Sequence, residues 1–83
     1  MCLAVPGKVI AILDAERQLA SVEVAGVARR INLSLLPDDE QAGPGDWVLV
    51  HIGLALKRIS EEEASETERV LRQITMELEA TPG

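Results

Sequence analysis

The residues best suited to chemistry in this sequence are a single cysteine and a single histidine. Cys2 follows the first methionine, where a thiol is expected to be accessible and not deep in a core. If Met1 is removed, the α-amine and the thiolate of Cys2 can close a chelate ring on a soft or borderline metal ion. The alternative is a small apolar residue without a function, the commoner case for a cysteine.

His51 is the second candidate and lies in the apolar run VLVHIG, residues 48–53. Strand alternation places it on the same face as Trp47 and Leu49. A lone histidine on such a strand is more often a hydrogen-bonded structural residue than a metal ligand, so the pattern alone favours structure. Cys2 and His51 would also suit a thiol hydrolase, but no spacing rule brings them together.

The pair Pro6-Gly7 is the third feature. Proline fixes φ at roughly −65° and glycine turns freely, so the pair is expected to set the angle at which the N-terminal segment joins the first strand. An ordinary turn is the alternative. The sequence has no CxxC pair, glycine-rich phosphate loop or nucleophile elbow, so standard catalytic equipment is nearly absent.

Short strands are predicted to position these residues. Apolar runs and alternation predict strands over 8–13, 19–24, 27–34, 47–52 and 54–59. Ala25-Gly26 favours a tight reversal, and Gly53 favours a bend or bulge. The basic pair Arg29-Arg30 is expected at a sheet edge, where charge discourages aggregation. The acidic segment 37–46, rich in proline and glycine, is predicted to be a surface loop.

The last segment changes to helical spacing. Ala64, Leu71 and Leu78 fall on one stripe, and Ser60 with Glu63 forms a capping box. Strands followed by a helix predict a mainly β fold, namely a small OB-like, partly open barrel of about five strands with a C-terminal helix. Strand count alone leaves an SH3-like barrel open. We expect a single domain over 1–83, with the barrel in 1–59 and the helix in 60–80.

Composition narrows the function classes. Eight basic and 14 acidic side chains give a net charge of −6, which repels nucleic acid, and one aromatic residue cannot build a base-stacking platform. No apolar run approaches the roughly 20 residues that span a bilayer, and no basic and apolar leader is present. These features, with an unpaired cysteine, predict a soluble cytoplasmic protein that binds neither nucleic acid nor membranes.

Two segments of the chain resemble the HypC/HupF (HybG-like) family. The N-terminal string MCLAVPGKV is similar to the family's opening of Met-Cys, an aliphatic residue, Gly or Ala, an aliphatic residue and Pro. The segment GDWVLVHIGLA, residues 45–55, resembles the family's Gly-Asp-aromatic-Val-Leu-Val-His block followed by Gly and Ala. Leu54 departs from it, since relatives often carry an aromatic residue there. The resemblance covers essentially the whole chain.

This resemblance implies a non-enzymatic chaperone of hydrogenase maturation with an OB-like barrel. Such a protein would bind the maturation protein HypD and the hydrogenase large-subunit precursor, and hand over iron that carries cyanide and carbon monoxide ligands. The iron would be transient cargo, with no cofactor permanently bound. Cys2 and His51 become the expected metal residues, and Cys2, Pro6 and Gly7 the expected partner contacts. An OB-type nucleic-acid-binding module and a Cys/His thiol enzyme are the alternatives.

Overall fold

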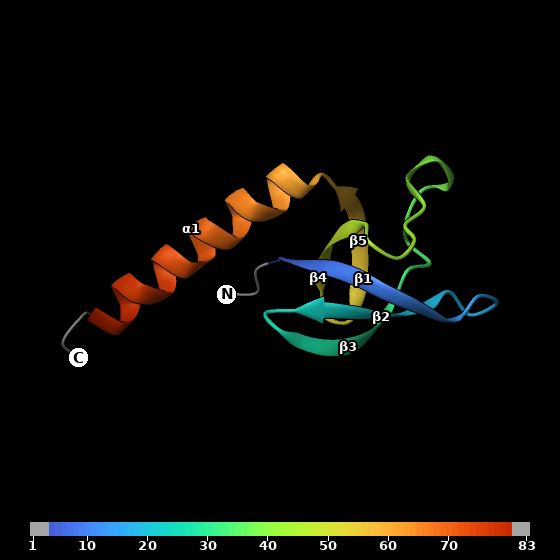
Figure 1. Cartoon of the computed structure of the whole chain (residues 1–83), viewed down its shortest axis with the longest axis horizontal. Helices are drawn as coiled ribbons and strands as arrows, with labels where there is room; N and C mark the ends of the chain where they lie inside the picture. Colours follow the sequence, from blue (N-terminus) through green and yellow to red (C-terminus); the bar gives the residue numbers. More distant parts are fainter. Residues whose placement is uncertain (1–3, 81–83) are drawn as a thin grey trace.

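The computed structural model describes residues 4–80 of the chain, with side chains through residue 74. It consists of a five-stranded barrel and one C-terminal helix, which confirms the predicted fold class (Figure 1). The elements are β1 (Val5–Asp14), β2 (Leu19–Val24), β3 (Val27–Asn32), a short 3-10 helix (Asp38–Glu40), β4 (Trp47–His51), β5 (Leu54–Ile59) and α1 (Glu61–Ala80).

The strands close in the order β1-β2-β3-β5-β4, because β4 also pairs with β1. All neighbours are antiparallel except β3 and β5, which run parallel and share the single residue pair Asn32 and Leu54. This arrangement fits an OB-like barrel. The prediction of a partly open barrel was wrong, because the sheet closes, although the β3–β5 seam is thin.

The first strand begins earlier than its sequence suggests. Pro6 and Gly7 are part of β1, paired with Leu49 and Val48 of β4, so the prediction that they precede the strand was wrong. Gly7 is buried, and an added Cβ would lie 2.5 Å from Cγ1 of Val22. Barrel closure therefore extends the strand through a Pro-Gly pair, because glycine alone lets β1 approach β2 this closely.

The tight reversal predicted at Ala25-Gly26 is confirmed as a two-residue hairpin turn, and the bend or bulge predicted at Gly53 is also such a turn. Ala25 and Gly26 have φ values of 52° and 81°, and Ile52 and Gly53 have values of 50° and 73°. Positive φ at both positions is what a type I′ turn requires. Ile52 is the unusual member, because it is a β-branched residue in the left-handed region and 77% of its surface is exposed.

The core fills the inside of the barrel and is wholly apolar among the described residues. From β4 it takes Val48 and Val50, so Trp47, Leu49 and His51 lie on the opposite, half-buried face. The cluster consists of Val9, Ala20, Val22, Ile31, Leu33, Leu36, Val48, Val50 and Ala55. His51, the last residue of β4, thus lies at the barrel rim on the face opposite the core.

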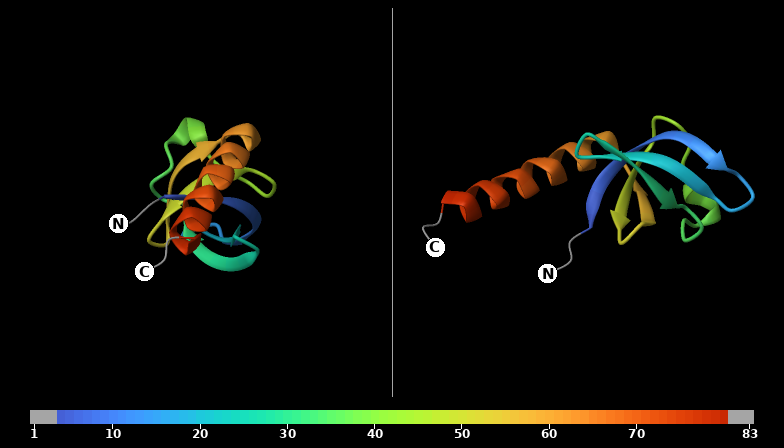
Figure 2. Two further views of the ribbon diagram at one scale, coloured as in Figure 1. Left: turned by 90° about the vertical axis from the view of Figure 1, so that its left-hand side faces the viewer. Right: turned by 90° about the horizontal axis from the view of Figure 1, so that it is seen from below.

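Helix α1 begins at the predicted capping box. The Glu63 amide donates to the Ser60 hydroxyl at 3.1 Å, and the Ser60 amide donates to a Glu63 carboxylate oxygen at 3.4 Å. Ala64 is fully buried, whereas Ile74, further along the same stripe, is 42% exposed. The helix therefore docks by its first turns and then projects from the barrel, giving extents of 48 × 22 × 20 Å (Figure 2).

Within the described residues, no helix has both the length and the apolar character needed to cross a membrane.

Candidate functional site

His51 is the last residue of β4 and is half-buried. Its backbone pairs with Leu54 across the Ile52-Gly53 turn. Among the described residues, no group forms a hydrogen bond or ion pair with its ring. The hydrogen-bonded structural role that the strand pattern favoured for His51 is therefore not observed over this part of the chain.

Most of the block around His51 has a structural explanation. Gly45 adopts a φ of 93°, and the Asp46 carboxylate accepts a 2.8 Å hydrogen bond from the Gly43 amide. The Asp46 carbonyl accepts a bond from the Val9 amide at 2.9 Å, which ties the loop to β1. Together with the buried valines and the positive φ of Gly53, these contacts account for the tight turns before and after β4. They do not account for an imidazole at residue 51.

The N-terminal end of β1 lies beside the C-terminal end of β4. Val5 pairs with Val50, so the residue before Val5 and the residue after Val50 stand at the same end of the barrel. A hollow of about 510 Å³ opens there, which we call the barrel mouth. Apolar residues line much of it, and its polar residues are Arg29, Arg30 and His51.

Arg29 and Arg30 reach the mouth from β3. Both are exposed. Because β3 pairs with β5 only at Asn32, the two arginines lie on a part of β3 whose edge toward β5 is unpaired. This agrees with the predicted edge position. Their convergence with His51 was not predicted, because β3 and β4 are separated by β5 in the sheet and by a long loop in the sequence. No spacing pattern in the sequence indicates that the two arginines lie close to His51.

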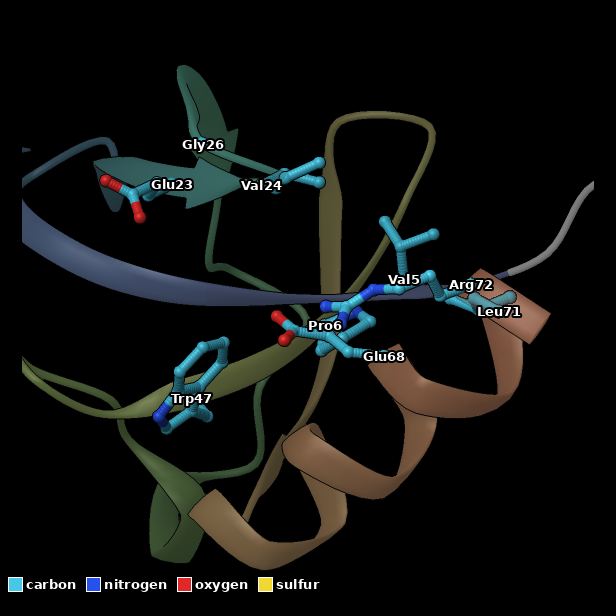
Figure 3. A pocket seen from close by; sticks show the side chains of 10 residues that line it. Val5, Pro6, Glu23, Val24, Gly26, Trp47, Glu68, Leu71 and Arg72 are labelled. Carbon is cyan, nitrogen blue, oxygen red and sulfur yellow. The ribbon is translucent and has the colours of Figure 1, made fainter. Parts of the chain in front are cut away.

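A second and larger hollow, of about 690 Å³, lies between the barrel and the helix (Figure 3). Trp47 contributes to its barrel wall, and Leu71 and Arg72 contribute to its helix wall. Val5 and Val24 line both this groove and the barrel mouth, so the two hollows adjoin where β1 begins. We place the candidate chemistry in the smaller hollow, because that one contains the histidine.

The other predicted site residues fall in different surroundings. Cys2 lies outside the described residues. Pro6 is buried and lines the groove, and Gly7 is buried against Val22, so packing alone requires a glycine there. Their predicted contacts with partners remain predictions. In the described part of the chain, no three His, Cys, Asp or Glu residues cluster in a way that could hold a metal ion.

The structure is thus a small closed β-barrel with a hollow at one end and a projecting C-terminal helix. The chain belongs to the HupF/HypC family, whose model matches residues 1–71. It is 43% identical over 79 residues to hydrogenase maturation factor HybG of Escherichia coli, covering 94% of this chain and 96% of that protein. It is also 43% identical over 79 residues to hydrogenase maturation factor HypC of Helicobacter hepaticus, covering 95% and 87%. The family resemblance of the two sequence segments is thereby confirmed.

Proposed function

We propose that this protein is a chaperone of hydrogenase maturation that carries iron bearing cyanide and carbon monoxide ligands. It receives this group with a HypD partner and passes it to the hydrogenase large-subunit precursor. Family membership and relatives named as hydrogenase maturation factors support the role. The pairing of Val5 with Val50 is the structural observation that carries it, since it brings the start of β1 to the His51 end of β4.

Chain geometry supports joint use of Cys2 and His51. Cys2 precedes Val5 by three residues, and three residues span at most about 11 Å. Connectivity alone therefore keeps Cys2 within that distance of Val5, a residue that lines the mouth together with His51. A soft thiolate and an imidazole are both suitable iron ligands, and we assign them as the donors that hold the cargo.

Two protein donors suit a carrier better than a complete ligand set. A structural site surrounds its metal with four protein ligands and retains it, whereas a carrier must release the metal to the next protein. The iron is therefore substrate and not a resident cofactor, and no catalytic turnover is needed. A thiolate ligand must also stay reduced, which favours a cytoplasmic location.

The groove beside the mouth suits a transient partner. It contains Pro6 and the half-buried Trp47, and it adjoins the mouth at Val5. A protein docked there would lie next to the bound iron. Exchange between two successive partners requires interfaces of modest area, which a small barrel can provide.

The test is to purify the protein from cells that produce hydrogenase and to measure iron content and the infrared bands of cyanide and carbon monoxide. Cys2→Ser is expected to abolish both signals and hydrogenase maturation, because a hydroxyl is a hard, poorly ionised donor. His51→Ala is expected to reduce iron retention while the melting temperature and binding of HypD stay nearly unchanged. Normal maturation with Cys2→Ser would overturn the proposal.

The same preparations test the two alternative functions. Turnover of a thioester or peptide by the isolated protein, lost with Cys2→Ser, would indicate a thiol enzyme instead. Tight, salt-sensitive binding of oligonucleotides would indicate a nucleic-acid-binding module.

A further inference from the structure

We propose that Arg29 and Arg30 make the barrel mouth a recognition site for cyanide-bearing metal complexes. Their guanidinium groups donate hydrogen bonds to the cyanide nitrogen atoms of the bound complex. This inference rests on the proposed function and adds to it the residues that distinguish the cargo from a bare iron ion.

The charge of the mouth is opposite to that of the molecule. The chain carries a net charge of −6, yet the residues that line the mouth include two arginines and a histidine and no carboxylate. Over the described side chains, neither Arg29 nor Arg30 forms an ion pair, unlike Arg17 with Asp14 at 3.8 Å. A cationic hollow with free donors in an acidic protein attracts and orients an anion.

The two arginines approach the mouth from different sides of β3. Arg29 is paired with Val22, which is fully buried, so Arg29 lies on the face of β3 that turns toward the barrel interior. Arg30 is paired with Ser21 and lies on the outer face. Both nevertheless line the same hollow. Donors from two directions can contact two ligands of one metal, which adjacent donors on one face cannot do as readily.

The chemistry of the cargo matches this lining. A cyanide bound to iron through carbon presents a nitrogen with negative charge, which accepts hydrogen bonds well, whereas bound carbon monoxide is a poor acceptor. Guanidinium offers several N–H donors in a fixed plane, which suits such anions. The remaining wall of the mouth is apolar and accommodates the carbon monoxide ligand. Its apolar side chains are Val5, Val24, Ala28, Ile31, Val50 and Ile52.

Hexacyanoferrate(II) is the probe for the test, because its filled coordination shell leaves only its cyanide nitrogens to be recognised. Calorimetric titration of the full chain is expected to show binding, and NMR is expected to show shifts of the Arg29, Arg30 and His51 side-chain signals. The double variant Arg29→Gln/Arg30→Gln should lower the affinity by roughly tenfold or more, since charge-assisted bonds are lost. Arg17→Gln/Arg69→Gln is the matched control, because it also removes two positive charges, at residues that do not line the mouth.

Four outcomes would overturn the inference: no binding of hexacyanoferrate(II), full affinity in the Arg29→Gln/Arg30→Gln variant, an equal loss of affinity with Arg17→Gln/Arg69→Gln, or sulfate binding as tightly as the cyanide complex. Circular dichroism melts confirm that the variants fold. Cys2→Ser separates this inference from the proposed function, because it should leave hexacyanoferrate(II) binding unchanged while abolishing maturation. If Cys2→Ser still supports maturation, the proposed function fails. If the Arg29→Gln/Arg30→Gln variant keeps full hexacyanoferrate(II) affinity while Cys2→Ser abolishes maturation, the arginine inference fails and the proposed function stands.

Discussion

Replacing Ile52 by asparagine is expected to stabilise the protein. Ile52 has a φ of 50° in the tight turn between β4 and β5, a conformation that branched L-residues rarely adopt. The left-handed conformation costs about 1–2 kcal/mol for an ordinary L-residue, and asparagine is one of the few residues that tolerate it. The natural sequence therefore keeps a strained residue at the edge of the barrel mouth.

The size of the effect follows from exposure. Because 77% of the Ile52 surface is accessible, its removal forfeits only about a quarter of the roughly 1.5–3 kcal/mol that full burial of such a side chain contributes. The net gain is then about 0.5–1.5 kcal/mol after the relief of backbone strain. For a domain of this size, that corresponds to a rise in melting temperature of roughly 2–12 °C.

Thermal and urea unfolding of Ile52→Asn beside the natural protein provide the measurement. Ile52→Val is the matched control, because valine keeps the β-branch and therefore the strain, and its stability should hardly change. An asparagine variant that melts at or below the temperature of the valine variant would refute the reasoning. Strain retained at an exposed apolar residue beside His51 is expected to serve a contact with a partner protein. Pull-down of the proposed HypD partner with Ile52→Asn tests that expectation.

Two further predictions concern the scaffold, and both are read from unfolding curves. Gly7→Ala should destabilise the barrel by roughly 1–3 kcal/mol, because the new methyl group would lie 2.5 Å from Val22 in a packed interior. An unchanged melting temperature would show that β1 and β2 can separate freely. Ser60→Ala should cost about 0.5–2 kcal/mol, because the Glu63 amide loses its side-chain acceptor; the test fails if helix content and melting temperature both stay unchanged.

The strands and the helix start were predictable because their causes are local. Alternation over β2 exposes one face and buries the other, and the spacing of Ser60 and Glu63 supplies both capping bonds. The start of β1 was not predictable from local rules. Pro6-Gly7 has the composition of a turn, and only pairing with β4, distant in sequence, makes it a strand.

The extent of helix docking also escaped prediction. The apolar stripe shows which side of α1 faces the barrel, but it contains no information on how far the barrel reaches along the helix. Ala64 is fully buried, whereas Ile74 is 42% exposed. Likewise, the type of residue made His51 a candidate, but its two arginine neighbours follow from the strand order of the closed barrel, which periodicity does not specify.

The barrel mouth coincides with the weakest part of the sheet. Strands β3 and β5 are joined by the single pair Asn32 and Leu54, supported by a 2.9 Å hydrogen bond from the Asn32 amide to the Gly53 carbonyl. Leu54 is also the partner of His51 across the turn. Since locally thin pairing lowers the free energy of local opening, movement at this seam would displace His51 while the valine core stays packed. Under the proposed carrier function, the protein must loosen its hold on cargo without unfolding, and a site at the thin seam of an otherwise closed barrel would allow that.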